Sequence, residues 1–290
     1  MATSRSKRAF VIPFLGILAA IFVHSVWQLF ATGLAPVWLG PSIVAGSFFA
    51  FMGWMMLSGA ARTSERLPGL LAAGAGGLAV ALAGAVGGTT PAALPMSYAL
   101  AGFIGLVVYV FWYSNLGREP SAVLRVGATL PEFLVDTESG QSVSSLALRG
   151  KPAVWLFFRG NWCPLCMAQI REVAERYKEL EARGAEVVLV SPQSQLHTRA
   201  LAKRFSVPFR YFIDRDGRAA RALGILHESG VPLGIPGYGA DTVFPTVIVT
   251  DAEGRILLAD QTDNYRVRPE PDTFLAALDA ARAKRACSGT

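Results

Sequence analysis

Charged residues are scarce in the first part of this 290-residue chain, where long stretches contain none. Over the whole chain 17% of the residues are charged and 52% are hydrophobic, which excludes an ordinary soluble protein. Four stretches without Asp, Glu, Lys or Arg reach the length of about 20 residues that a helix needs to cross a bilayer. They comprise residues 9–30, 41–60, 67–87 and 96–114. We therefore predict that residues 1–117 form an all-α membrane domain with four transmembrane helices.

Cations are absent from two of the loops that join these stretches. Residues 31–40 and 88–95 carry no charge, whereas the cations near the predicted helices all lie in the other loop or in the flanks. Those cations are Arg5, Lys7, Arg8, Arg62, Arg66, Arg118 and Arg125. The positive-inside rule therefore predicts that both termini are cytoplasmic, together with the C-terminal domain. A cleaved signal peptide is the alternative for the first stretch, but its apolar run exceeds the usual ~7–15 residues and three more runs follow, so we predict a retained helix.

Cysteine is absent from the predicted membrane domain, which excludes an electron relay through membrane thiols. The only histidine there, His24, is interpreted as a polar contact inside the helix bundle, with a quinone or ligand contact as the alternative. Small residues recur at intervals of four in the third stretch and let helix backbones approach closely. They are Gly69, Ala73, Gly77, Ala81 and Ala85. We expect them to pack within the four helices, with self-association as the alternative, and we expect this domain to anchor the chain in the lipid bilayer or to bind a membrane partner protein.

A basic patch is also lacking, although the formal net charge is +6. Residues 1–120 hold most of the excess cations, and the rest of the chain is close to neutral. The high isoelectric point therefore reflects the membrane region, and we predict no nucleic-acid partner.

Beyond a short polar linker, residues 118–125, apolar runs of strand length alternate with amphipathic helices. Strands are predicted over residues 153–158, 186–190, 209–213, 246–250 and 255–260. Helices are predicted after Cys163, over residues 195–205 and over residues 272–284. The order strand, helix, strand, helix, strand, hairpin, helix indicates an α/β thioredoxin-like fold for residues 126–290.

The helix after Cys163 has apolar residues at spacings of four and three, which form one buried stripe. Proline at position 164 suits its first turn, and Gly184 suits its end. The stripe comprises Cys166, Ile170, Val173, Tyr177 and Leu180. We therefore predict a single helix from Pro164 to the residues before Gly184.

Two cysteines, Cys163 and Cys166, have the spacing C-x-x-C where the strand meets this helix. In a cytoplasmic domain this spacing is typical of a redox pair rather than of a permanent disulfide. At a helix N-terminus, unpaired N–H groups and the helix dipole lower a thiol pKa from about 8.5 into a range of roughly 3.5–7.5. We therefore predict Cys163 as the nucleophile, and Cys166, one turn further, as the resolving cysteine that closes an intramolecular disulfide.

A zinc site and simple core packing are the competing interpretations of the pair. Structural zinc needs four ligands, so a lone C-x-x-C is a weak signal for the metal. Only Cys287, His197 and His227 remain as further ligands, and none has a helpful spacing. We predict a redox pair without metal or bound cofactor, and we expect Cys287 in the polar tail to be a free thiol.

Two segments resemble the peroxiredoxin-like branch of the AhpC/TSA family (alkyl hydroperoxide reductase and thiol-specific antioxidant), within the thioredoxin-like superfamily. They are FFRGNWCPLC at residues 157–166 and VVLVSPQ at residues 187–193. The resemblance continues through residues 212–214, 244–249 and 264–278, and it covers nearly all of residues 126–285 but not the membrane half. It implies a thioredoxin fold in which Cys163 reduces a peroxide or a disulfide and Cys166 resolves it. A thioredoxin- or glutathione-type reductant would then restore the dithiol.

The resemblance also implies supporting roles around the cysteines. Pro245 would be a cis-proline facing the pair, and Trp162 would shield the sulfur as the tryptophan before a thioredoxin C-x-x-C does. Arg159 would stabilise the thiolate or polarise a peroxide, with a solvated loop arginine as the alternative. From the residues alone, Pro245 is a proline at a strand start, where a trans bond is the default, and Trp162 is a packing residue.

One position departs from the family pattern. Typical peroxiredoxins have Thr three residues before the peroxidatic cysteine, whereas this chain has Gly160. The arginine that such proteins bring from a later strand is also not identified in the sequence. Three hypotheses therefore stay open: a membrane-anchored antioxidant peroxidase, a protein disulfide reductase without peroxidase activity, and a non-enzymatic redox sensor or scaffold.

Overall fold

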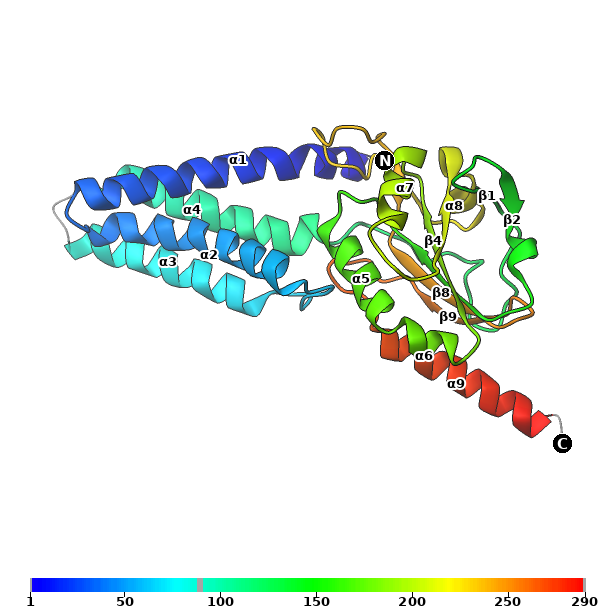
Figure 1. Ribbon diagram of the computed structural model, residues 1–290. Coiled ribbons are helices and arrows are strands. Elements are labelled where there is room, and N and C mark those ends of the chain that lie inside the picture. Colours follow the sequence, from blue (N-terminus) through cyan, green and yellow to red (C-terminus); the bar gives the residue numbers. More distant parts are fainter. Residues whose placement is uncertain (1, 88–90, 289–290) are drawn as a thin grey trace. The chain divides into compact units, whose positions relative to one another are not determined.

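The computed structural model describes residues 2–87 and 91–288 and divides into two compact units (Figure 1). One unit contains residues 9–115, and the other contains residues 1–8 together with residues 116–290. Residues 88–90 of the predicted loop 88–95 lie outside the described residues. The side chain of Cys287 is likewise not among the described side chains, so its predicted free thiol stays a prediction.

Long apolar helices make up the first unit, as the charge-free stretches predict. The helices are α1 (Ala2–Ala31), α2 (Pro36–Ser58), α3 (Pro68–Gly87) and α4 (Ala93–Val108), which continues as a π-helical turn, η1 (Tyr109–Tyr113). Among the described residues, four helices are long and apolar enough to cross a membrane. His24 lies inside this unit and hydrogen-bonds the hydroxyl of Tyr98 at 3.1 Å, which agrees with the interpretation as a polar contact within the bundle.

Close packing of α2 on α3 depends on glycine. A Cβ atom on Gly77 would lie 2.8 Å from the carbonyl oxygen of Gly40. The buried residues of α3 are alternately four and three apart, and they are Leu70, Gly74, Gly77, Ala81 and Gly84. The predicted stripe with a strict interval of four is therefore only partly right, since Gly77 and Ala81 are buried but Gly69 is exposed. Four residues exceed the 3.6 of one helical turn, so such a series winds around the helix.

A seven-stranded sheet forms the centre of the second unit, in the order β2-β1-β5-β4-β3-β8-β9. Its strands are β1 (Leu134–Asp136), β2 (Ser142–Ser144), β3 (Ala153–Phe157), β4 (Glu186–Ser191), β5 (Arg210–Ile213), β8 (Thr246–Thr250) and β9 (Ile256–Asp260). Strands β3, β4 and β5 are parallel, whereas β8 and β9 run antiparallel to their neighbours. All five residues of β3 are buried, as its continuous apolar run predicts. This arrangement confirms the thioredoxin-like α/β fold.

The helices of this unit end at residues other than those predicted. They are α5 (Pro164–Glu175), α6 (Tyr177–Glu181), α7 (Gln195–Ala202), α8 (Arg218–Ala222) and α9 (Pro271–Ser288). The single helix predicted after Cys163 is broken at Arg176, whose φ of −98° and ψ of 10° leave the helical region. Helices α5, α6 and α9 lie together on one side of the sheet, where Arg176 pairs with Asp272 and Arg183 pairs with Asp279 (Figure 1).

Short elements between β5 and β8 escaped prediction because they carry too few residues for a periodic pattern. Helix α8 is held by Asp214, whose carboxylate accepts the backbone N–H groups of Ala219 and Ala220 at 2.8 and 2.9 Å. Strands β6 (Leu226–His227) and β7 (Thr242–Val243) form a separate two-stranded sheet. The chain between them is a loop whose two ends lie side by side.

The segment predicted as a linker packs onto the second unit. Arg118 is buried. Its guanidinium donates to the carbonyl of Pro245 at 3.0 Å and to the hydroxyl of Thr246 at 2.9 Å. Its backbone N–H donates to the carboxylate of Asp263 at 2.6 Å. Burial lowers the pKa of Arg118 to about 10 despite these nearby carboxylates. Arg118 therefore fastens the start of this unit to β8.

Candidate active site

Strand β3 and helix α5 together place the two cysteines. The chain leaves β3 at Phe157 and turns through a short loop, and Cys163 then occupies the N-cap position of α5 with Pro164 at its first turn. Cys166 lies within that first turn. Both thiols are reduced and buried, with exposed fractions of 2% for Cys163 and 0% for Cys166. The two predicted redox residues are therefore neighbours at the mouth of one helix.

Gly160 explains the departure from the family pattern. Its φ of +140° lies in a region that residues with a side chain rarely adopt. A Cβ atom there would lie 2.9 Å from the indole of Trp162 and 3.0 Å from the ring of Tyr238. Threonine at this position would strain the backbone and collide with both rings, so this loop requires glycine.

Charge around the pair favours an anion on Cys166 rather than on Cys163. A hydrogen bond to Cys166, reinforced by burial, raises the pKa of Cys163 well above its ordinary value. Burial opposes ionisation of Cys166 as well, but the hydrogen bond from Cys163 and the charge of Arg268 outweigh it and lower the pKa of Cys166 to about 5. The predicted low pKa of Cys163 is thus wrong for the reduced pair, because the nearest positive charge lies against the other sulfur.

Arg268 supplies this charge, and sequence reasoning missed it. Its Nη2 lies 3.5 Å from the sulfur of Cys166, and its Nη1 donates to the side chain of Gln169 at 2.9 Å. The side chain is 6% exposed. Arg268 follows β9 in an irregular segment, so neither spacing nor periodicity signals that it meets α5.

Arg159 is buried beside the pair rather than solvated. Its Nη2 donates to the carbonyl of Gly230 at 2.5 Å, and its guanidinium lies 4.6 Å from the centroid of the Trp162 ring. The backbone N–H of Arg159 also donates to Cys166. Trp162 stacks against this guanidinium, which is a packing contact, and its shielding of the sulfur stays a prediction.

Pro245 departs from what the resemblance implies. No peptide bond between described residues is cis, so Pro245 is trans. Its carbonyl accepts a hydrogen bond from Arg118 at 3.0 Å. The trans isomer of an X-Pro bond is more stable than the cis isomer by about 0.5–1 kcal/mol, and the residues next to Pro245 in the sequence do not reverse that preference.

Metal ligands do not cluster in the part of the chain that the structure describes, where no group of three His, Cys, Asp or Glu side chains is placed to hold an ion. His197 stacks on Tyr238 with ring centroids 4.4 Å apart, and His227 stacks on Phe244 at the same distance. Burial lowers the pKa of His227 to about 3, so this ring is neutral at physiological pH. Neither histidine is brought to the cysteine sulfurs as a ligand.

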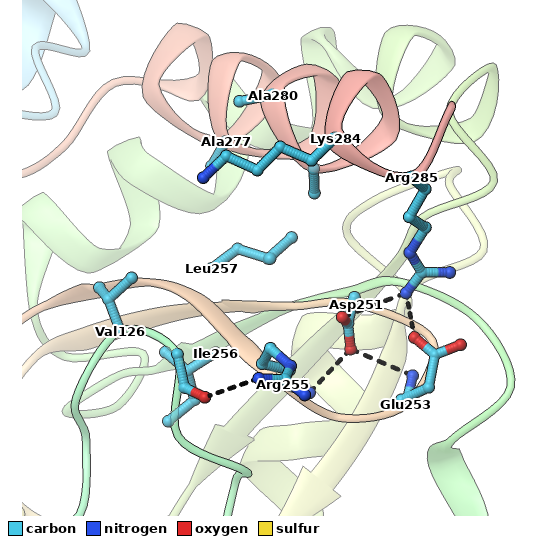
Figure 2. Close-up of a pocket in the computed structure, with 12 residues that line it drawn as sticks. Val126, Asp251, Glu253, Arg255, Ile256, Leu257, Ala277, Ala280, Lys284 and Arg285 are labelled. Atoms are coloured by element: carbon cyan, nitrogen blue, oxygen red, sulfur yellow. Dashed lines mark hydrogen bonds and ion pairs between the residues drawn. The ribbon is translucent and has the colours of Figure 1, made fainter. Parts of the chain in front are cut away.

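One cavity of this unit lies away from the cysteines. It has a volume of about 640 Å³ and opens between α9 and β9, with apolar side chains such as Leu257 and Ala277 in its wall (Figure 2). A second cavity of about 210 Å³ lies at the redox site and is lined by polar residues that include Arg159, Gln193 and Tyr238. This smaller cavity shares Arg159 with the surroundings of the cysteine pair.

The second unit has a thioredoxin-like sheet, and a reduced C-x-x-C pair lies at the start of one of its helices. An arginine stabilises one of the two sulfurs as an anion. These features define this unit as a thiol oxidoreductase. Comparison with known proteins agrees with this class. Residues 126–259 match the AhpC/TSA family. They therefore form an AhpC/TSA family domain.

Individual relatives include both peroxidases and disulfide oxidoreductases by name. Peroxiredoxin Q of Sedum lineare is 29% identical over 124 residues, which cover 40% of this chain and 67% of the relative. Thiol-disulfide oxidoreductase ResA of Geobacillus thermodenitrificans is 32% identical over 114 residues, covering 39% of this chain and 64% of the relative. This chain thus spans about two thirds of the length of these relatives. The crystal structure of peroxidoxin BcpB from Mycobacterium tuberculosis aligns with a TM-score of 0.45 and 21% identity, over 54% of this chain and 97% of that one.

Proposed function

We propose that this chain is a membrane-anchored, thiol-dependent peroxidase that reduces small peroxides at the cytoplasmic face of a membrane. The enclosure of the cysteine pair carries this proposal. Neither sulfur is more than 2% exposed, and the guanidinium of Arg268 lies 3.5 Å from Cys166. A peroxide gains negative charge as its O–O bond breaks, and buried donors stabilise such charge well. A protein disulfide would instead need a sulfur at the surface.

Cys163 is the attacking residue in this proposal, because it precedes the helix and lies nearer the loop surface than Cys166 does. Its proton passes to Cys166 through the hydrogen bond that the two thiols share. The Cys163 thiolate then attacks one peroxide oxygen, the O–O bond breaks, and the leaving oxygen takes a proton and departs as water or an alcohol. Cys163 is left as a sulfenic acid.

Cys166 completes the cycle by attacking the sulfenic sulfur. The S–S bond forms as the S–O bond breaks, and the oxygen leaves as water. Two thiol equivalents from a thioredoxin- or glutathione-type reductant then restore the dithiol by exchange. Arg159 and Arg268 stay beside the sulfurs throughout and stabilise the negative charge on whichever sulfur carries it.

Membrane anchoring rests on the four apolar helices. Their length and composition suit a bilayer span, and the cations that flank them follow the positive-inside pattern. A redox domain fastened to the cytoplasmic face would remove peroxides near lipids before they reach other targets.

Peroxide consumption by the full chain in detergent tests the proposal. With a dithiol donor present, the wild-type chain should consume hydrogen peroxide, and the variants Cys163→Ser and Cys166→Ser should not sustain turnover. Arg171→Ala, an exposed residue of α5, serves as the control and should keep wild-type activity. A wild-type chain that leaves hydrogen peroxide untouched would refute the peroxidase.

A protein disulfide reductase is the second candidate, and the Trp162-Cys163-Pro164 loop favours it, since a tryptophan and a proline flank the first cysteine as in thioredoxin. Insulin reduction by the same preparation distinguishes the two. A chain that reduces insulin rapidly and hydrogen peroxide hardly at all would be a reductase.

A further inference from the structure

The loop between β6 and β7 covers the redox site. We call residues 228–241 the cover segment. Its ends are joined by pairing of β6 with β7, and the backbone N–H of Val231 donates to the carbonyl of Ala240 at 3.0 Å. It thus forms a compact loop of the Ω type, a kind that is frequently functional.

The tip of the cover segment is built to bend. Gly234 and Gly237 both have positive φ, at +86° and +78°, and Gly239 follows with open space around its Cα. Glycine visits such conformations without steric cost and leaves the backbone several alternatives. Tyr238 stands between the last two of these glycines and is the only aromatic residue of the segment.

Tyr238 carries the ring contacts that the tip makes with α7 and with the active-site loop. Its ring stacks on His197 with centroids 4.4 Å apart and planes 4° apart. It also meets Trp162 edge-on, with centroids 6.4 Å apart. Its hydroxyl faces the backbone N–H groups of Asn161 and Trp162, in the loop that leads to Cys163. The hydroxyl oxygen thus lies beside amide N–H groups of the active-site loop.

Two further observations mark this place as an access point. Tyr238 also lines the cavity of about 210 Å³ whose wall includes Arg159, and this volume suits a small molecule rather than a folded chain. The sulfurs below it are at most 2% exposed, so a substrate reaches them only when something moves. The flanking glycines give Tyr238 more backbone freedom than an ordinary loop residue has.

We propose that Tyr238 determines substrate specificity, by covering the active-site loop so that small hydroperoxides reach Cys163 while bulky hydroperoxides and protein disulfides are held out. The predicted substrate classes rest on the proposed peroxidase function, whereas the covering of the active-site loop by Tyr238 does not depend on it. Moving Tyr238 aside uncovers the backbone N–H of Trp162, while the N–H of Asn161 donates to the side chain of Gln193 at 2.9 Å.

Alkylation of the reduced full chain in detergent tests the cover without any peroxide. Iodoacetamide reacts with an accessible thiolate, so its rate of reaction with the Cys163–Cys166 pair, read by mass spectrometry, reports opening. An aromatic pair contributes about 0.5–1.5 kcal/mol beyond its buried area. Tyr238→Ala should therefore raise this rate about tenfold, which corresponds to ~1.4 kcal/mol. His197→Ala, which removes the other half of the stack, should raise it in the same direction.

Two controls keep the result specific. Tyr177→Ala removes a tyrosine that packs on Phe209 from α6, and it should leave the alkylation rate unchanged. Tyr238→Phe keeps the ring stack and should stay closer to wild type than Tyr238→Ala. Wild-type alkylation rates in both Tyr238→Ala and His197→Ala would overturn the proposal.

Selectivity is then measured as the ratio of turnover with cumene hydroperoxide to turnover with hydrogen peroxide. Tyr238→Ala should raise this ratio, and insulin reduction should rise with it. An unchanged ratio in a variant that alkylates faster would refute the specificity role. A wild-type chain that is inactive with every peroxide would instead refute the proposed function, while the alkylation rates would still decide whether Tyr238 covers the site.

Discussion

At the scale of single residues, the two sulfurs share one negative charge, and the surrounding arginines decide where it lies. Arg268 and the backbone N–H of Arg159 both face Cys166, whereas Cys163 faces mainly its partner thiol. The helix N-terminus alone would favour an anion on Cys163. A guanidinium 3.5 Å from Cys166 outweighs that dipole because a full charge in a buried site acts more strongly than a partial one.

The first ionisation of the pair should therefore occur near pH 5, where the pKa of Cys166 lies. This value lies below the ~8.5 of an unfolded thiol, so the anion stabilises the reduced fold at neutral pH, and that stabilisation is lost as the pH falls through about 5. Ultraviolet thiolate absorbance against pH measures the midpoint. A midpoint near pH 8 would contradict this assignment, and so would a midpoint that has the same value in Cys166→Ser as in the wild type.

Removing Arg268 should make the anion harder to form. In Arg268→Met the thiolate midpoint should rise by roughly 1–3 pH units, since an opposite charge at this range shifts a pKa by that amount. Peroxide turnover at pH 6 should fall more than turnover at pH 8, which a purely structural defect would not produce. Arg268→Lys keeps the charge and should recover part of the loss, and equal loss in both variants at both pH values would argue against an electrostatic role.

At the scale of elements, short helices in this fold depend on buried side chains rather than on their own length. Helix α8 has five residues, too few to be stable alone, and Asp214 holds its first N–H groups. Asp214 is fully buried, so no water replaces it as an acceptor. The strand β5, which ends just before it, therefore also positions α8.

Asp214→Ala should lower the free energy of unfolding of the redox domain by about 1–3 kcal/mol, because two buried N–H groups lose their acceptor. Asp272→Ala, whose side chain is 69% exposed in its pair with Arg176, is the matched control and should cost less than ~1 kcal/mol. Thermal unfolding of the full chain in detergent compares them. Equal destabilisation by the two variants would contradict the capping role.

Helix packing in the apolar unit gives a second test at this scale. Gly77→Ala would push a Cβ to 2.8 Å from the carbonyl oxygen of Gly40, so α2 and α3 must separate, at a cost of roughly 1–3 kcal/mol. The adjacent Gly76 has no atom within 4 Å of an added Cβ, and Gly76→Ala should be neutral or slightly stabilising. Heat-induced aggregation in detergent ranks the two variants, and a ranking in the opposite order would refute this packing.

At the scale of the whole molecule, the proposed orientation makes the most direct prediction. A chain with its native cysteines replaced by serine and a single cysteine at the exposed position Glu175 should react with a membrane-impermeant maleimide only from the cytoplasmic side. Inverted and right-side-out vesicles provide the two sides. Labelling from the outside alone would reverse the topology that the cations predict.

Much of the architecture follows from local pattern. The charge-free stretches correspond to the four long helices, and the apolar run of β3 corresponds to a strand buried along its whole length. A hydrophobic pattern that repeats over many residues predicts an element well, because burial of the apolar side chains stabilises each repeat. The break at Arg176 and the short helix α8 were not predictable in this way, since tertiary packing decides such short segments.

The sequence by itself determined the thiol chemistry, because the C-x-x-C spacing joins Cys163 to Cys166 through one helical turn whatever surrounds them. Only the tertiary structure decided which sulfur holds the charge and what covers it. Arg268 lies 102 residues beyond Cys166, and Tyr238 comes from a loop between two short strands. Contacts between such distant residues depend on how the strands are ordered in the sheet, and no local spacing in the chain records that order.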